Sequence, residues 1–212
     1  MTVLKRLMDL ICVALFVATL WPVFIWVSCL VLLRDGRPVF YRSERMKTAT
    51  QPISLIKFRT MTADPKDAGV SGGDKAHRIT RTGAFLRRNR LDELPQIWNV
   101  LRGDISFVGP RPPLRRYVEL FPELYAEVLR SRPGVTGLAS LVYHRHEEQL
   151  LNACRDAEQT EAVYTRRCIP AKARLDLIYQ RKRTICFDIW LMFSTVIRRM
   201  PTRMKQSVTR QN

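Results

Sequence analysis

The 212-residue sequence predicts a compact, α-rich α/β domain attached to an N-terminal membrane helix. Three observations support this prediction. Residues 10–33 contain no charged side chain and are long enough to cross a hydrocarbon core of ~30 Å as a helix. Two short segments that follow are rich in the β-branched and aromatic residues of strands. The remaining chain shows helical apolar spacings between Pro and Gly residues, and its length suits one domain.

The membrane segment contains Pro22 near its middle, where proline removes a helical hydrogen bond and favours a kink. Lys5 and Arg6 precede the segment, and a larger group of basic residues follows it. The positive-inside rule therefore assigns both ends to the cytoplasm, together with the main domain. A re-entrant helix would place both ends in the cytoplasm, whereas a single-pass anchor would place only one end there. The residues alone leave both alternatives open. The basic residues that follow are Arg34, Arg37, Arg42, Arg45 and Lys47.

The composition indicates an anionic partner. The sequence has 36 Lys and Arg against 19 Asp and Glu, a formal net charge of +17. Nucleic acid, an acidic membrane and phosphorylated substrates all fit such a charge. No helix-turn-helix, zinc-finger or aromatic RNA-binding signature supports nucleic acid. The five cysteines form no CxxC pair and the three histidines no HExxH motif, so neither set predicts a metal centre.

Two strands joined by a turn are expected after the membrane segment. They correspond to residues 38–46 and 53–61, and the turn to residues 48–51. Residues 63–77 are rich in Gly, Asp and Lys, which predicts a mobile loop that acts as a lid. The basic tail, residues 201–212, is expected to be flexible.

A pair of carboxylates is expected at the start of a helix. Asp92 is placed as its N-cap, with Glu93 in the first turn, and Gly103 ends it. The helix N-terminus would stabilise the carboxylate charge and keep Asp92 ionised. Such carboxylate pairs often only stabilise the start of a helix. Whether this pair has a functional role therefore depends on the residues around it. The apolar residues at i, i+3, i+4 and i+7, predicted to form the buried stripe, are Leu94, Ile97, Trp98 and Leu101.

Basic residues surround this acidic pair in the sequence. A short helix over residues 83–90 would bring Arg87, Arg88 and Arg90 close to the carboxylates, and the GPRPP segment would present Arg111 on a rigid turn. Further helices are predicted over residues 114–130, with a break at Pro122, and over residues 171–180. Residues 185–197 are apolar but too short to span a membrane, so an interfacial amphipathic helix is preferred to a core helix.

The segment LDELPQIWNVLRGDISFVGPRPP, residues 91–113, resembles the bacterial sugar transferase family, the monotopic polyprenyl-phosphate phosphoglycosyl transferases. The resemblance begins at KRLMDL and continues through IKFRTM, ITRTGAFLRR and RPGVTGLAS to the helix that contains Asp188. It implies a re-entrant helix over residues 1–35, bent near Pro22, and a catalytic domain over residues 36–200. It also implies the bacterial inner membrane as the location, with the catalytic domain on the cytoplasmic face.

The resemblance implies a role for each candidate site residue. Asp92 would be the nucleophile that attacks the β-phosphate of a nucleotide diphosphate-sugar, expected to be a UDP-sugar, and polyprenyl phosphate would accept the sugar 1-phosphate from it. Glu93 would help to hold Mg²⁺. The substrate-binding residues implied are Lys57, Arg87, Pro110, Arg111 and Pro112.

Undecaprenyl phosphate and membrane lipids are the further partners expected, and a homodimer is compatible with these features. The alternative is a membrane-anchored basic protein that binds acidic lipid or nucleic acid without catalysis. That alternative makes Asp92 and Glu93 dispensable.

Overall fold

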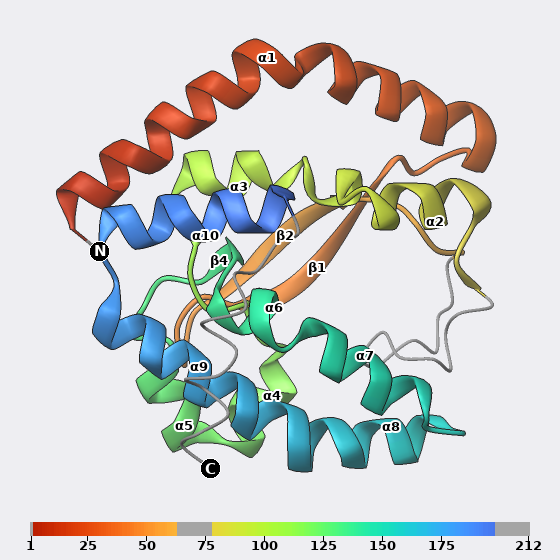
Figure 1. The fold of residues 1–212 in the computed structure, drawn as a ribbon. Helices are drawn as coiled ribbons and strands as arrows, with labels where there is room; N and C mark the ends of the chain where they lie inside the picture. The colour runs from red at the N-terminus through yellow and green to blue at the C-terminus, as the bar shows by residue number, and fades with distance from the viewer. Residues whose placement is uncertain (1, 63–77, 198–212) are drawn as a thin grey trace.

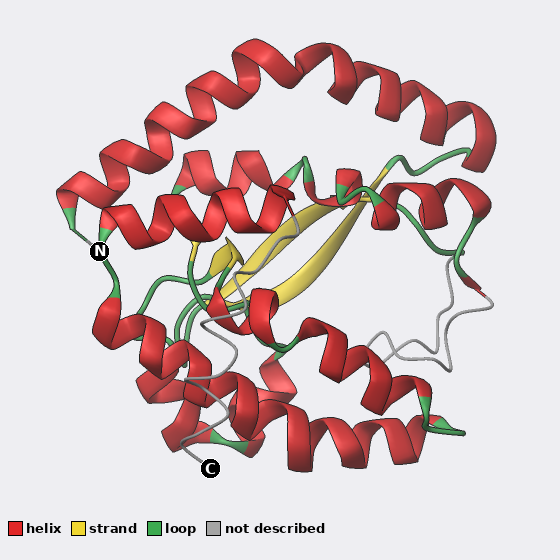
Figure 2. Ribbon diagram, viewed as in Figure 1, coloured by secondary structure: helices red, strands yellow, loops and turns green. Residues whose placement is uncertain are grey.

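The computed structural model describes residues 2–62 and 78–197, and it shows a helix-rich domain beneath one long, arched helix (Figure 1). In the view of Figure 2 the few strands lie among the helices. The predicted lid, residues 63–77, and the predicted basic tail lie outside the described residues. The helices are α1 (Val3–Asp35), α2 (Arg81–Arg88), α3 (Gln96–Arg102), α4 (Arg115–Leu120), α5 (Pro122–Val128), α6 (Leu138–Val142), α7 (His144–Asn152), α8 (Ala157–Val163), α9 (Ile169–Lys182) and α10 (Ile185–Ile197).

The described residues form two small sheets of two strands each. The strands β1 (Phe40–Met46) and β2 (Pro52–Phe58) form the predicted antiparallel hairpin, closed by a hydrogen bond from the Lys47 N–H to the Gln51 carbonyl at 2.8 Å. The strands β3 (Ser106–Val108) and β4 (Gly134–Thr136) form a parallel pair. The sequence predicts only turns around Gly134, so this second pair was missed.

The apolar helix α1 passes Pro22 without interruption and curves as an arch over α2 and α3 (Figure 1). Thr2 caps its first turn by accepting a hydrogen bond from the Lys5 N–H. Its length and hydropathy are sufficient to cross a membrane, and little of its apolar stretch is buried within the protein. Both properties are consistent with membrane anchoring.

The beginning of α1 is fastened to the domain by buried polar groups. The Lys5 ammonium lies 2.5 Å from an Asp188 carboxylate oxygen and donates to the Tyr179 hydroxyl at 3.2 Å. Tyr179 also lies 2.7 Å from the other Asp188 oxygen. One turn further, Asp9 accepts hydrogen bonds from the Ser106 hydroxyl and from the backbone of β3. The apolar helix α1 is thus joined to α9, α10 and β3.

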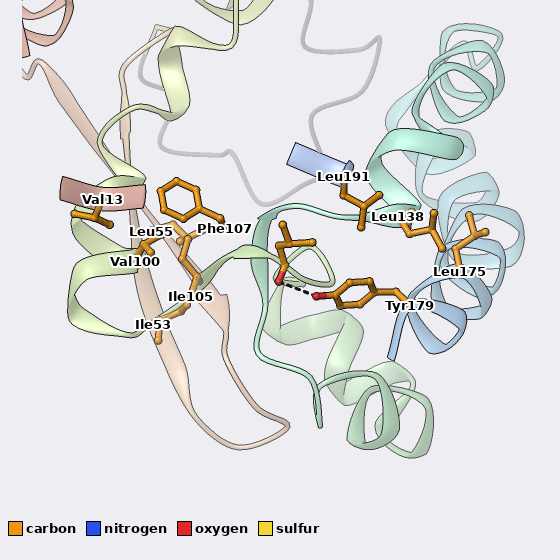
Figure 3. Packing of buried hydrophobic residues seen from close by; sticks show 12 residues of the cluster. Val13, Ile53, Leu55, Val100, Ile105, Phe107, Leu138, Leu175, Tyr179 and Leu191 are labelled. Carbon is orange, nitrogen blue, oxygen red and sulfur yellow. Dashed lines mark hydrogen bonds between the residues drawn. The ribbon is translucent and has the colours of Figure 1, made fainter. Parts of the chain in front are cut away.

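Three hydrophobic clusters hold the elements together. The largest joins α1, β2, α3 and β3 to α6, α9 and α10, and includes Val13, Val100, Ile105 and Leu191 (Figure 3). A second lies among β1, α4, α5 and α9. The third fastens the far end of α1 to β2 and α2, and its buried residues are Val27, Val31, Phe58 and Leu86.

The last described helix, α10, has one face in the domain and one face outside it. Asp188, Leu191 and Ser194 recur at intervals of three residues and are buried. Ile189 and Phe193 are exposed on the outer face, 42% and 63% respectively. The helix therefore combines core packing with an apolar outer surface of the kind that suits a membrane interface.

We predict that Lys5→Met destabilises the protein by about 3–5 kcal/mol, because it leaves the buried Asp188 carboxylate without its cation. In a domain of this size the apparent melting temperature should fall on the order of 10 °C. Thermal unfolding in detergent measures this. Adding Asp188→Leu to the variant should restore most of the loss, and exposed Lys182→Met serves as the control. A Lys5→Met protein as stable as the wild type would contradict a structural role for the pair.

Candidate active site

Asp92 and Glu93 lie in a 3-10 turn, η2 (Leu91–Glu93), that precedes α3. The prediction of Asp92 as a helix N-cap is wrong, because α3 begins only at Gln96 and Pro95 occupies the cap position. The Leu94 N–H bonds to the Leu91 carbonyl and tightens the chain into a separate turn. The backbone enters this turn in the left-handed conformation at Arg90, with φ of 59°. Asp92 is 9% exposed.

Glu93 is held by cations from three separate segments. Its carboxylate lies 3.1 Å from the Lys57 ammonium of β2 and 3.0 Å from the Arg111 guanidinium. Arg90, next to the turn, is 4.0 Å away. Burial alone would raise the pKa of Glu93, but Arg111 and Lys57 together hold it far below its usual range. Glu93 is therefore ionised at neutral pH.

Asp92 lies in a less favourable environment for its charge. Burial, and then the neighbouring Glu93 carboxylate, raise the pKa of Asp92, while Lys57, Arg87 and Arg111 oppose this rise. The expected stabilisation by a helix N-terminus is thus replaced by side-chain cations. A poorly solvated carboxylate close to several cations is suited to react with an electrophilic phosphate group.

Arg87 reaches the site because α2 packs closely against the chain that follows β2. Thr80 caps α2 by accepting from the Gly83 N–H at 2.8 Å. A Cβ on Gly83 would lie 2.1 Å from the Thr60 carbonyl oxygen, so only glycine allows this approach. The Arg87 Nε–H then donates to the Thr60 hydroxyl at 2.9 Å. The predicted cation is in place, but it comes from a helix that begins at Arg81.

The predicted rigid turn places Arg111 as expected. Pro110 and Pro112 are buried and support the turn, while the Arg111 side chain is 40% exposed and reaches Glu93. The turn is joined to β1 by a hydrogen bond from the Met46 N–H to the Pro113 carbonyl at 2.9 Å. It is joined to β4 by a bond from the Gly134 N–H to the Pro110 carbonyl. The second sheet therefore fixes the position of Arg111.

The apolar stripe predicted for α3 is not the buried face of that helix. Trp98 and Leu101 are 54% and 42% exposed, whereas Asn99 and Val100 are buried. Asn99 was missed, although it positions the site: its side chain accepts from the Ile56 N–H and donates to the Ser54 carbonyl along the edge of β2. A polar residue within an apolar helical pattern was the available signal.

The structure thus brings together Asp92, Glu93, Lys57, Arg87 and Arg111, with Pro110 and Pro112 as supports. In the part of the chain that the structure describes, no three His, Cys, Asp or Glu side chains form a metal cage. The two adjacent carboxylates still fit a hard cation, because Mg²⁺ is commonly held by one or two carboxylates plus substrate phosphates.

The fold and the site together define a domain that carries an apolar helix and presents a carboxylate pair among cations. Comparison with known proteins gives this class a family: residues 1–201 match the bacterial sugar transferase family. The chain belongs to that family.

Individual relatives agree with this assignment. EpsL of Bacillus subtilis strain 168, named as an uncharacterised sugar transferase, is 39% identical over 139 residues, 66% of this chain and 68% of EpsL. The UDP-glucose:undecaprenyl-phosphate glucose-1-phosphate transferase of Escherichia coli K12 is 33% identical over 92% of this chain. The chain spans 40% of that relative's length. The exopolysaccharide production protein PSS of Rhizobium leguminosarum is 35% identical, over 92% of this chain and 94% of PSS.

We predict that Lys57→Met weakens binding of inorganic pyrophosphate by about tenfold or more, because a charge-assisted hydrogen bond in a buried site is lost. Isothermal titration calorimetry on the purified protein measures this affinity. The matched control is Arg115→Met, since Arg115 forms an exposed ion pair with Glu44 and has no ion pair with Glu93. Equal affinities of the two variants would show that Lys57 does not serve an anion site.

Proposed function

We propose that this chain transfers a sugar 1-phosphate from a UDP-sugar to undecaprenyl phosphate through a covalent aspartyl intermediate. The observation that carries the proposal is the buried Asp92 beside an ionised Glu93. Lys57, Arg87 and Arg111 act electrostatically on Asp92, and Lys57 and Arg111 are also paired with Glu93. The names of the relatives support the donor and acceptor classes. The reaction would initiate exopolysaccharide, O-antigen or other glycoconjugate synthesis.

The first step is a displacement at the β-phosphorus of the donor. An Asp92 carboxylate oxygen forms a bond to phosphorus, and the bond from phosphorus to the UMP oxygen breaks. UMP leaves with the bonding electron pair. Arg87 and Arg111 lie where they can balance the charge of the phosphate oxygens, which is the main requirement in phosphoryl transfer.

The second step reverses the roles of nucleophile and leaving group. A phosphate oxygen of undecaprenyl phosphate attacks the same phosphorus, and the bond to Asp92 breaks. The free carboxylate is regenerated and the product is a lipid-linked diphosphosugar. Two displacements at one buried carboxylate predict ping-pong kinetics.

Mg²⁺ is the metal proposed for this site. Glu93 would hold it together with phosphate oxygens of the donor, and when bound the ion would neutralise charge on the reacting phosphate. Lys57 and Arg111 keep Glu93 deprotonated and therefore able to bind a cation.

The membrane arrangement proposed is a re-entrant α1, with the catalytic domain on the cytoplasmic face of the bacterial inner membrane. Basic residues flank both ends of the helix, which fits the positive-inside rule. Lys5 and Asp9 fasten its beginning to the domain, while Val27 and Val31 fasten its far end to the same domain. A helix that crossed to the opposite side could not keep both sets of contacts.

The test is UMP release from a panel of UDP-sugars by protein purified in detergent, with Mg²⁺ and undecaprenyl phosphate. Asp92→Asn should lower the rate at least about 10³-fold, because the amide is no nucleophile. The control is Asp156→Asn, since Asn also caps a helix and Asp156 caps α8 far from the turn. Undiminished release by Asp92→Asn would exclude the covalent mechanism. Absence of release by folded wild-type protein on every donor would favour the non-catalytic alternative.

A further inference from the structure

An apolar cavity of about 480 Å³ lies between the arch of α1 and the domain beneath it. Phe16, Leu20 and Phe24 line it from α1, Ile56 from β2, and Trp98 from α3. These side chains leave the cavity almost wholly apolar. Its volume and its apolar lining fall within the range of sites that bind small ligands.

The cavity explains why the apolar stripe of α3 is exposed. Ile97 and Trp98 form part of the cavity wall, and Trp98 is 54% exposed even though the arch passes above it. The protein therefore presents an amphipathic helix face that none of its own described residues covers. Exposed apolar faces of this kind are typical of surfaces that contact lipid or an apolar ligand.

One part of the cavity wall adjoins the candidate active site in the chain. Leu94 and Pro95 line it, and they directly follow Glu93 in the chain. A ligand that contacts Leu94 and Pro95 would therefore touch the segment that directly follows the two carboxylates.

The hairpin separates the cavity from the polar site. Side chains alternate between the two faces of a strand, so Ile56 and Lys57 point to opposite sides of β2. Lys57 reaches Glu93, whereas Ile56 lines the cavity. Phe40 and Phe58, cross-strand partners in β1 and β2, stack at 5.3 Å on the cavity side. The hairpin thus offers one face to anionic groups and the other to hydrocarbon.

Arg42 is the charged residue in the cavity wall. It is opposite Ile56 in the hairpin register, and among the described residues it forms no ion pair with a carboxylate. Arg42 gives an otherwise apolar cavity one positive charge. The combination suits an amphiphile with a hydrocarbon chain and an anionic head group.

We propose that this cavity binds the first isoprenoid units of the polyprenyl phosphate acceptor, with Arg42 placed to contact its phosphate. The inference rests on the proposed function. It places the acceptor on the Ile56 face of the hairpin and the donor on the Lys57 face. The acceptor is favoured over a bulk phospholipid because Leu94 and Pro95, the two residues that follow Glu93, form part of the cavity wall. The donor would approach from the Lys57 face of the same hairpin, so the two substrates need not compete for one space.

The test fills the cavity and measures each half-reaction separately. Val17 lines the cavity and is 54% exposed; Leu15 lies two residues earlier, is 60% exposed and does not line it. Val17→Trp should raise the KM for undecaprenyl phosphate by about tenfold or more, because a preformed apolar space is lost. Single-turnover release of UMP without acceptor should stay within about twofold. Leu15→Trp should leave both quantities within about twofold of the wild type.

Acceptor length and labelling give two further measurements. The difference in KM between undecaprenyl phosphate and a short-chain prenyl phosphate should shrink in Val17→Trp. A prenyl phosphate with a diazirine near its head should label α1 and α3 peptides, and excess undecaprenyl phosphate, unlike excess phosphatidylglycerol, should prevent labelling.

Three outcomes would overturn the inference: an unchanged acceptor KM in Val17→Trp, labelling away from α1 and α3, or equal competition by the phospholipid. If the folded wild-type protein released no UMP from any UDP-sugar, the result would instead contradict the proposed function itself.

Discussion

The buried ion pair between Lys5 and Asp188 is the constraint on which the rest of the structure depends. It joins residues 183 positions apart, at a place where an unpaired charge would cost several kcal/mol. Tyr179 contacts both partners, so the beginning of the apolar helix can occupy one position relative to α9 and α10. The packing of Val27 and Val31 against Phe58 and Leu86 fixes the other end. Between these two fastenings α1 must curve, and Pro22 lies within the curve.

The curvature has a consequence for the proposed chemistry, because the turn that contains Asp92 and Glu93 lies beneath the arch (Figure 1). Asp92 and Glu93 lie in the turn that precedes α3. Asn99 of α3 forms hydrogen bonds with the backbone at the edge of β2, and the apolar side of α3 faces α1. The hairpin then divides the space, with Lys57 on the side of the carboxylates and Ile56 on the side of the cavity. A reaction between a water-soluble phosphate donor and a membrane-bound acceptor needs such a boundary, since each substrate comes from a different solvent. The proposed function therefore gives α1 two roles, as a wall of the acceptor site and as an anchor.

Features that depend on local sequence could be predicted. The membrane helix followed from an uncharged run, the hairpin from two β-rich segments and a turn, and the exposed Arg111 from the prolines on either side of it. The environment of Asp92 could not be derived in this way, because its cations arrive from β2, α2 and the turn after β3 through contacts distant in sequence. The N-cap prediction failed because Pro95 starts α3 later than the periodicity indicated. The apolar stripe that contains Trp98 shows what apolar spacing cannot predict. The spacing identifies an apolar face of a helix, but it does not tell whether protein or a ligand covers that face.

The central claim is that Asp92 carries the sugar phosphate between donor and acceptor, and intact-protein mass spectrometry tests it most directly. The purified protein is incubated with Mg²⁺ and a UDP-sugar that supports turnover, without acceptor. The account predicts a mass gain of one sugar phosphoryl group, located on the peptide that contains Asp92, and its loss when undecaprenyl phosphate is added. Lipid-linked product formed without any such adduct, or an adduct on another residue, would contradict the account.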